Sequence, residues 1–466
     1  MRDSTHSAHS THLTQSAHRT TQIFQVSTLY GAATLAAALD AGQFGAREGT
    51  RRILLVSQNA TVPETALRLD EMHGYAPIVR RFDQVVSWNE AIRPHHPSVW
   101  GPRGDDATLW QRAFRLAWDI GPREKVEIAV ESIQVNPGRA LAAIFSESAV
   151  HVYADGLMSY GPTRERLPLS IGSRIQRLLQ LDLVPGLRPL LLSEFDVAPE
   201  VVPDEAFRAV LDEIAAEAAD DPRLTPVREQ APTAVLLGQY LAAINILSAD
   251  EEEDLHVRML GAAARAGHRS IVFKPHPTAP PSYSAALSKA AADAGVRLAV
   301  LDAPLLAETL YEHVRPELVV GCFSTAMVTA SAYYDVPVGR VGTALVMERL
   351  KPYQNSNRVP LAIVDHVVPD LAAGESAALV GTAPASLPPL VRTIGFCMQP
   401  ALLEQSREQA EAYLREHLAG LPGHYFPEPR LAELDLPGAG PQARAKLQAR
   451  RARRVVGRTV RRTPRR

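Results

Sequence analysis

The motif Lys274-Pro275-His276-Pro277 is the part of this sequence whose residue types point most directly to chemistry. It follows the apolar run SIVF, which is typical of a buried strand. Prolines on both sides of His276 fix the backbone and stop the strand from continuing. An imidazole held at a strand end in this way can donate a hydrogen bond to a phosphate. The alternative is a rigid turn in which His276 only ends the strand.

A second candidate is the segment Gly321-Cys322-Phe323-Ser324-Thr325, between the apolar run ELVV and the helical pattern TAMVTASAYY. A turn from strand to helix presents backbone N–H groups at the positive end of the helix, and two adjacent hydroxyls add side-chain donors. Ser324 and Thr325 are therefore predicted phosphate ligands. The alternative is ordinary N-capping of the helix by Ser324.

The third candidate is Asp155-Gly156, which ends the apolar run AVHVYA. A carboxylate at a strand end faces the ligand side of a parallel sheet, and glycine allows a substrate to approach the backbone closely. Asp155 is thus a candidate general base. Asp-Gly is also a common turn dipeptide, which is the alternative interpretation.

Two weaker candidates and one acidic run complete this set. Glu308 opens a helical stretch beyond the run RLAVL and can accept hydrogen bonds from ribose hydroxyls; the alternative is a solvated helical glutamate. Gly238-Gln239 follows the run TAVLL and can lie against a nucleotide. The acidic run DEEED at 250–254 is interpreted as the first turn of a helix, where acidic groups complement the helix dipole.

Short β-branched runs alternate with amphipathic stretches from Ile23 onward, which is the pattern of βαβ units and a mostly parallel sheet. In the first half we expect strands at 23–27, 53–57, 84–87, 126–130 and 149–153, and helices at 31–41, 63–73, 107–118 and 137–146. In the second half we expect strands at 233–238, 270–274, 297–301, 317–321 and 336–341. The sequence therefore predicts an α/β protein with two Rossmann-like, doubly wound domains facing a cleft, where ligands bind beyond the carboxyl ends of the strands.

The predicted domain boundaries follow these two series. Residues 161–203 look like loops, and an acidic, Ala-rich helix at about 204–219 begins the expected linker. We predict a disordered N-terminal tail at 1–22, an N-terminal Rossmann-like domain at 23–203, a linker at 204–231, a C-terminal Rossmann-like domain at 232–400, a helix at 401–424 that crosses back to the first half, and a flexible basic tail at 425–466.

Composition limits the class of protein. Hydrophobic residues make up 46% and charged residues 21% of the 466 residues, which is ordinary for a globular chain. Two cysteines are too few for a disulfide framework, and no membrane span or signal peptide is evident, so we expect a cytoplasmic protein. Residues 444–466 carry eleven Lys and Arg and no acidic residue. This tail is suited to an anionic membrane surface, and the alternative is a solvated tail that only raises solubility. Nucleic acid is not expected, because the tail has no aromatic residue to stack on bases.

Taken in order, Asp155-Gly156, the Lys-Pro-His-Pro turn and the pair Ser324-Thr325 resemble the three signatures of bacterial sialyltransferases. These are an acidic-acidic-Gly motif, a His-Pro motif and a paired Ser/Thr motif. The sequence is most similar to the bacterial alpha-2,8-polysialyltransferase family, over roughly residues 22–400. One departure is Ala154, which occupies the first acidic position of the first motif, so acceptor binding or tuning of the base can differ from the family pattern.

The resemblance implies a GT-B fold and an inverting transfer of a nonulosonic acid from a CMP-activated donor to a glycan or lipid-linked acceptor, without a metal. It implies Asp155 as the base in the acceptor domain and His276 as phosphate ligand or acid. The residues expected to bind the donor nucleotide are Gly238, Lys274, Pro277, Glu308, Ser324 and Thr325. The absence of a DxD-type motif near these strand ends agrees with a metal-independent enzyme.

Two other functions fit the same residues. A CDP-glycerol or CDP-ribitol phosphotransferase of the teichoic-acid type also resembles a GT-B fold with His-Pro and Ser motifs. It differs in its donor, since only a nonulosonic acid donor carries its own carboxylate. A non-catalytic GT-B-like scaffold that docks on membrane or polyanion through its basic tail is the alternative from another class, and Ala154 motivates it.

Overall fold

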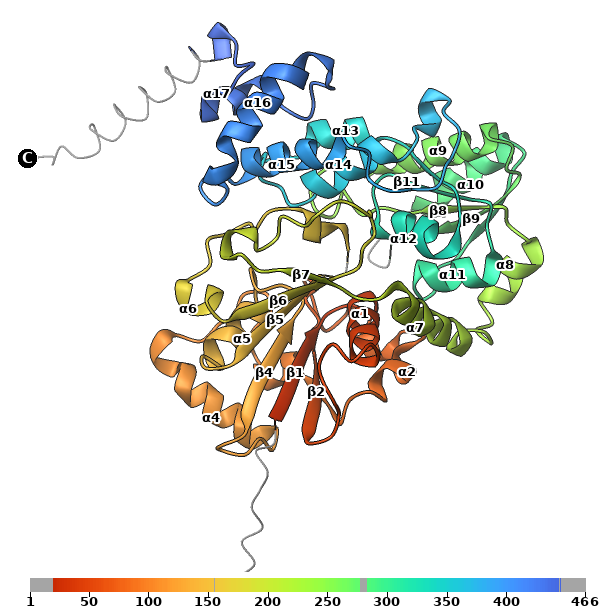
Figure 1. Ribbon diagram of the computed structural model, residues 1–466. Helices are drawn as coiled ribbons and strands as arrows, with labels where there is room; N and C mark the ends of the chain where they lie inside the picture. Colours follow the sequence, from red (N-terminus) through yellow and green to blue (C-terminus); the bar gives the residue numbers. More distant parts are fainter. Residues whose placement is uncertain (1–19, 155, 277–282, 444, 446–466) are drawn as a thin grey trace, which may run out of the picture.

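The computed structural model describes residues 20–154, 156–276, 283–443 and 445, and its strands form two sheets of parallel pairs (Figure 1). The first sheet has the order β3-β2-β1-β4-β5-β6-β7. Its strands are β1 (Thr20–Val26), β2 (Thr50–Val56), β3 (Gln84–Ser87), β4 (Lys125–Val130), β5 (Ala149–Ala154), β6 (Ile175–Gln180) and β7 (Pro199–Val201). The strand order reverses between β1 and β4, which is the switch point of a Rossmann-like sheet.

The second sheet repeats this arrangement with five strands in the order β10-β9-β8-β11-β12, and its switch point lies between β8 and β11. Its strands are β8 (Ala234–Leu237), β9 (Ser270–Lys274), β10 (Arg297–Val300), β11 (Leu318–Gly321) and β12 (Val338–Arg340). The runs AVLL and LVVG are buried throughout, as expected for central parallel strands with both faces covered. Two such domains in one chain form a GT-B architecture, which confirms the predicted fold class.

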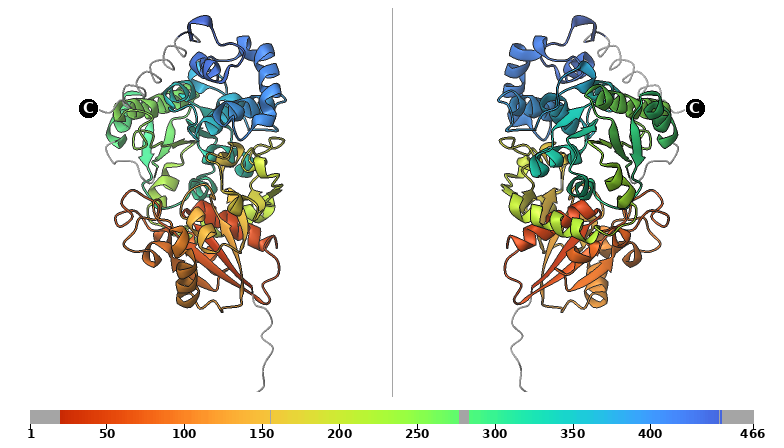
Figure 2. Two further views of the ribbon diagram at one scale, coloured as in Figure 1. Left: turned by 90° about the vertical axis from the view of Figure 1, so that its left-hand side faces the viewer. Right: turned by 90° about the vertical axis from the view of Figure 1, so that its right-hand side faces the viewer.

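Helices cover both faces of each sheet (Figures 1 and 2). In the first domain they are α1 (Leu29–Asp40), α2 (Tyr75–Val79), α3 (Trp88–Ala91), α4 (Ala107–Ala117), α5 (Gly138–Ile144) and α6 (Leu169–Gly172). The remaining helices are α7 (Asp204–Glu217), α8 (Leu224–Gln230), α9 (Ala249–Arg265), α10 (Tyr283–Asp293), α11 (Ala307–Val314), α12 (Thr325–Tyr334), α13 (Thr343–Arg349), α14 (Arg358–Val367), α15 (Leu387–Met398), α16 (Arg407–His417) and α17 (Glu428–Leu434). No helix in these ranges is long and apolar enough to cross a membrane.

The segment 204–231 is part of the packed structure and not a free linker. Its first helix, α7, is the predicted acidic helix, and it packs against α1 and α2 of the first domain and against α11 of the second. Phe207, Val210 and Ile214 are fully buried in a hydrophobic core that continues from one domain into the other. The acidic residues of α7 lie on its outer side, which is why the sequence suggested a solvated connection.

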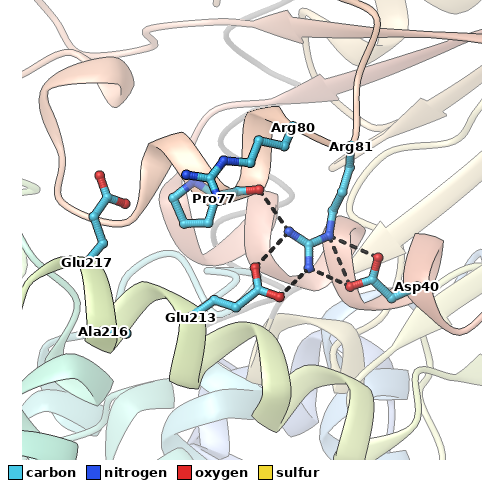
Figure 3. Close-up of a pocket in the computed structure, with 7 residues that line it drawn as sticks. All are labelled: Asp40, Pro77, Arg80, Arg81, Glu213, Ala216 and Glu217. Atoms are coloured by element: carbon cyan, nitrogen blue, oxygen red, sulfur yellow. Dashed lines mark hydrogen bonds and ion pairs between the residues drawn. The ribbon is translucent and has the colours of Figure 1, made fainter.

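Arg81 fastens α7 to the first domain. Its guanidinium contacts Asp40 Oδ2 at 2.6 Å and Glu213 Oε1 at 3.0 Å, and Figure 3 shows it between these two carboxylates. The three residues line an open groove of about 620 Å³ that contains none of the predicted site residues. The double ion pair joins α1, α2 and α7 into one unit.

The C-terminal region differs from its prediction. The helix predicted at 401–424 exists in its middle part as α16, but it packs on α15. It is α15 that contacts the first domain, where Gly395 lies against Leu190. Residues 425–443 were expected to be flexible, and this expectation is wrong for most of them, because Tyr425 is buried and donates a 2.6 Å hydrogen bond to Asp365 Oδ2. Two prolines of this segment begin α17: Pro427 is its N-cap and Pro429 lies in its first turn, a position that proline fits.

Most predicted elements of the first domain are confirmed, and the exceptions have physical causes. The tail at 1–22 was placed too far along, since β1 begins at Thr20; residues 1–19 lie outside the described ranges. The helix expected at 63–73 is wrong: the structure has turns and one short 3-10 segment there, and Leu67 is exposed. The strands β6 and β7 lie within the stretch that was expected to be loops. They were not predicted because β7 is only three residues long and the residues of β6 alternate weakly.

Candidate active site

The Lys-Pro-His-Pro turn follows β9 as predicted, at the carboxyl edge of the second sheet. Lys274 is buried, and its Nζ donates a 2.9 Å hydrogen bond to the carbonyl oxygen of Ala303. Burial lowers the pKa of Lys274 to about 8. One N–H of the Lys274 ammonium is thus already bound within the protein, and the contact of Lys274 with a nucleotide stays a prediction. Pro277 lies outside the described residues.

The imidazole of His276 is half-buried and stacks on the ring of Tyr240, with ring centroids 4.0 Å apart and planes 15° from parallel. Burial, together with the nearby charge of Lys274, lowers the pKa of His276 to about 4. At neutral pH this imidazole is therefore uncharged, with one N–H to donate and one nitrogen to accept. It can serve a phosphate through that single N–H, and it has no charge in the free protein to attract one.

Gly238 explains how the turn is supported. Its N–H donates a 2.9 Å hydrogen bond to the carbonyl oxygen of Lys274, and a Cβ at this position would lie 3.0 Å from Pro275 Cα and 3.1 Å from His276 N. Only glycine permits two backbones to approach this closely without displacement. Gly238 thus supports the His276 turn, and its predicted contact with a nucleotide stays a prediction.

Ser324 and Thr325 begin α12, which extends from the carboxyl end of β11. Ser324 is the N-cap, and its Oγ accepts a 3.2 Å hydrogen bond from the N–H of Ala326. The capping alternative for Ser324 is therefore correct. Capping does not exclude phosphate binding, because the N-terminus of α12 and the Ser324 hydroxyl both lie at the carboxyl end of β11. Thr325 Oγ1 accepts from the N–H of Leu157 at 3.4 Å, a contact between the two domains.

The loop after β5 meets α12 at Gly156. A Cβ built on this glycine would lie 2.5 Å from Thr325 Oγ1, so the contact requires glycine. Asp155 itself lies outside the described residues, but both of its neighbours are placed, with Ala154 ending β5 and Gly156 against Thr325. Gly156 of the first motif and Thr325 of the third, 169 residues apart, are thus brought together across the domain boundary.

Glu308 lies in the first turn of α11 and is only 2% exposed. Within the described ranges its Oε1 is buried without a hydrogen-bond partner, and burial raises the pKa of Glu308 to about 7. The adjacent hydroxyl of Thr329 on α12 contacts Tyr30 OH of α1 at 3.2 Å. Because it is buried, Glu308 is not the solvated glutamate of the alternative interpretation, and its contact with a ribose stays a prediction.

Three residues at or near the strand ends were not predicted from the sequence to have a role there. Ser27, at the end of β1, donates through its N–H and Oγ to Glu131 Oε2, at the end of β4, over 3.1 Å and 2.5 Å. This pair marks the switch point of the first sheet, and the strand-end rule applied elsewhere would have found it. Glu252 was attributed to the helix dipole, but it is fully buried and accepts from the N–H groups of Leu241 and Ala242 at 2.7 Å and 3.0 Å.

Two Rossmann-like domains meet at their carboxyl edges, where Gly156 of the first lies against Thr325 at the N-terminus of α12 in the second. This is the arrangement of a GT-B protein. The family model described as alpha-2,8-polysialyltransferase matches residues 22–342, and the chain belongs to this family. The protein is therefore a glycosyltransferase of sialyltransferase type. None of the curated proteins compared with the chain matches it.

Solved structures with similarity to the chain include two bacterial sialyltransferases. The GT-B domain of a Photobacterium damselae sialyltransferase is 12% identical, covers 73% of this chain and 95% of its own, and has a TM-score of 0.40. A 2,6-sialyltransferase from Photobacterium sp. JT-ISH-224, crystallised with CMP and lactose, is 11% identical over 76% of this chain and 78% of its own, with a TM-score of 0.42. At these identities, every residue assignment in this chain depends on its own geometry.

Proposed function

We propose that the protein transfers a nonulosonic acid from a CMP-activated donor to a hydroxyl of a glycan or lipid-linked acceptor, with inversion at the anomeric carbon. Asp155 removes the proton of the acceptor hydroxyl, and the resulting oxygen attacks the anomeric carbon as the bond from that carbon to the phosphate oxygen breaks. His276, Ser324 and Thr325 bind the phosphate of the departing CMP, and Glu308 accepts from its ribose hydroxyls.

The observation that carries this proposal is the contact of Gly156 with Thr325. It brings the loop of the predicted base, from the first domain, to the helix N-terminus of the second. An inverting displacement needs the base and the leaving-group ligands on opposite sides of one carbon, and two facing domain edges supply those sides. Membership of the polysialyltransferase family supports a sialic-type donor.

We further propose that departing negative charge is stabilised by hydrogen-bond donors of the protein. A neutral imidazole N–H, two hydroxyls and the N-terminal N–H groups of α12 are fixed donors, and fixed donors stabilise developing charge without reorganisation. Among the described residues, no three His, Cys, Asp or Glu side chains gather in a way that would hold a metal ion. Metal independence itself is a prediction that a chelator tests directly.

The experiment is CMP release from CMP-N-acetylneuraminic acid, measured with and without a sialylated oligosaccharide acceptor. We expect release that the acceptor accelerates and that excess EDTA leaves unchanged. CDP-glycerol in the same assay is the counter-substrate. Turnover of CDP-glycerol alone would replace the proposal by the phosphotransferase, a strict requirement for Mg²⁺ or Mn²⁺ would overturn the metal-independent mechanism, and binding without turnover of any donor would favour the scaffold.

We propose a cytoplasmic location at an anionic membrane surface, on the strength of the basic composition of residues 444–466, nearly all of which lie outside the described ranges. Each basic residue that reaches an anionic leaflet contributes about 1 kcal/mol, so four or five are enough to hold the enzyme beside a lipid-linked acceptor. Vesicles with anionic lipid should sediment the full chain at low salt and leave a chain ending at Pro441 in solution. Equal sedimentation of both chains would contradict this role of the tail.

A further inference from the structure

The ring of Tyr240 is the surface on which the imidazole of His276 rests. We propose that Tyr240 is a positioning residue that sets the direction of the His276 imidazole towards the departing phosphate. This inference rests on the proposed function for the identity of the ligand. The stacked geometry, with ring centroids 4.0 Å apart and planes 15° from parallel, covers one face of the imidazole and restricts its rotation.

Tyr240 is itself fixed from both sides by buried groups of α9. The N–H of Gln239 donates to Nε2 of His256 at 3.0 Å, and the N–H of Leu241 donates to Oε1 of Glu252 at 2.7 Å. His256 is 1% exposed and Glu252 is fully buried. A buried carboxylate that accepts backbone N–H groups is costly to displace, because removing either partner leaves a polar group unsatisfied. The backbone on either side of Tyr240 is therefore held in one place relative to α9.

The backbone of the two loops is joined as well. Gly238 donates to the carbonyl oxygen of Lys274, and the glycine brings the β8 loop to within van der Waals contact of Pro275 and His276. His276 is thus supported twice by the same loop, at its backbone through Gly238 and at its ring through Tyr240. The support extends from α9 through Glu252 to the imidazole.

Ring direction matters here because His276 is uncharged in the free protein. Burial lowers its pKa to about 4, so attraction between full charges does not guide it to a phosphate. A neutral imidazole has a single N–H, and a hydrogen bond weakens steeply when its angle falls below about 120°. Tyr240 holds the ring through its π face, and its hydroxyl is not required.

The test compares Tyr240→Phe with Tyr240→Ala in the full chain, using CMP for calorimetry and CMP-N-acetylneuraminic acid for turnover. We expect Tyr240→Phe to stay within about twofold of the wild type and Tyr240→Ala to lose about 10- to 100-fold in kcat/KM and in CMP affinity. In a His276→Ala background, Tyr240→Ala should change either quantity by less than about twofold, because its effect acts through His276. Tyr413→Ala is the matched control, since Tyr413 lies beside His417 on α16 with ring centroids 4.8 Å apart.

A second measurement does not depend on the substrate. NMR titration of the His276 imidazole should show its pKa rising towards the ordinary value in Tyr240→Ala, where one face of the ring is uncovered, and unchanged in Tyr240→Phe. If the wild-type protein does not bind CMP, the proposed function is contradicted. The positioning role of Tyr240 is then tested by this titration alone. The positioning role is overturned if Tyr240→Ala leaves the titration and turnover unchanged, if Tyr240→Phe is as damaging as Tyr240→Ala, or if Tyr240→Ala is equally damaging without His276.

Discussion

The carboxyl edges of the two sheets are built in different ways. In the second domain, the loop after β8 is held by Glu252 and His256, which are both buried, and the turn after β9 by the buried Lys274. In the first domain, Ser27 and Glu131 are half-buried and bind each other. Removing one of the buried groups of the second domain leaves its hydrogen-bond partner unsatisfied inside the protein. Removing Ser27 or Glu131 in the first domain leaves a partner that water can reach. The edge of the second domain is therefore the more rigidly held of the two. In the function proposed above, the donor binds to this edge and the acceptor to the other.

The largest expected effect separates the two edges by function. Asp155→Asn removes the proposed base, and we expect transfer to fall by about 10²- to 10⁴-fold while CMP affinity stays near that of the wild type. His276→Ala should lower CMP affinity and turnover together, because its contact is to the leaving phosphate. Calorimetry with CMP and initial rates on both variants measure the difference. Near-normal transfer by Asp155→Asn, or unchanged CMP affinity in His276→Ala, would remove the respective assignment.

The second prediction breaks the preformed edge. Glu252→Ala leaves the N–H groups of Leu241 and Ala242 without their acceptor, so we expect a loss of about 1 to 3 kcal/mol in the free energy of unfolding, together with weaker CMP binding. Glu131→Ala is the matched change at the other edge and should leave CMP affinity unchanged. Thermal unfolding and calorimetry test both. Equal effects of the two variants on CMP binding would erase the distinction between the edges.

The third prediction concerns the place where the edges meet. Gly156→Ala puts a methyl group 2.5 Å from Thr325 Oγ1, and we expect it to cost about 1 to 3 kcal/mol of stability. The double variant Gly156→Ala/Thr325→Ala removes the atoms that clash and should recover most of this loss. Thermal unfolding of the two variants and of Thr325→Ala gives the coupling between the positions. Additive losses would mean that the two residues do not meet in solution.

The smallest expected effect refines the donor edge. Burial raises the pKa of Glu308 to about 7, and a ribose that donates hydrogen bonds to its carboxylate favours the ionised form. Affinity for cytidine, which lacks a phosphate, should therefore rise about tenfold between pH 6 and pH 8. Glu308→Gln should remove this dependence. Calorimetry at the two pH values is the measurement, and an unchanged slope in Glu308→Gln would exclude Glu308 as the titrating group.

The residues at the strand ends could be predicted from the sequence. The buried groups that support the adjoining loops could not. His276, Ser324 and Asp155 were predicted as site residues because each follows an apolar run, and parallel strands present their carboxyl ends to a ligand. The role of Glu252 was missed because the acidic run at 250–254 fits a helix N-terminus equally well. Only the fold shows which of its carboxylates points inward, to a loop about ten residues earlier in the chain.

The same limit applies to the elements. Strands such as β8 and β9 are continuous apolar runs and were predicted correctly, whereas β7 and α17 owe their existence to neighbours that are distant in the sequence. Proline-rich composition suggested a mobile segment after 425, but Tyr425 is secured by a carboxylate 60 residues earlier. Contacts of this kind leave no periodic pattern for a reader of the sequence to use.

The attachment of Tyr425 and its surroundings to Asp365 sets where this protein can be shortened. Tyr425, Phe426 and Leu436 are at most 4% exposed, so a chain cut after the second Rossmann-like domain, near residue 400, would uncover the apolar face of α15 that they protect. Such a fragment is expected to aggregate. An expression boundary near Pro441 retains these buried residues and the hydrogen bond of Tyr425 to Asp365, and is the end point we expect to behave well in crystallisation.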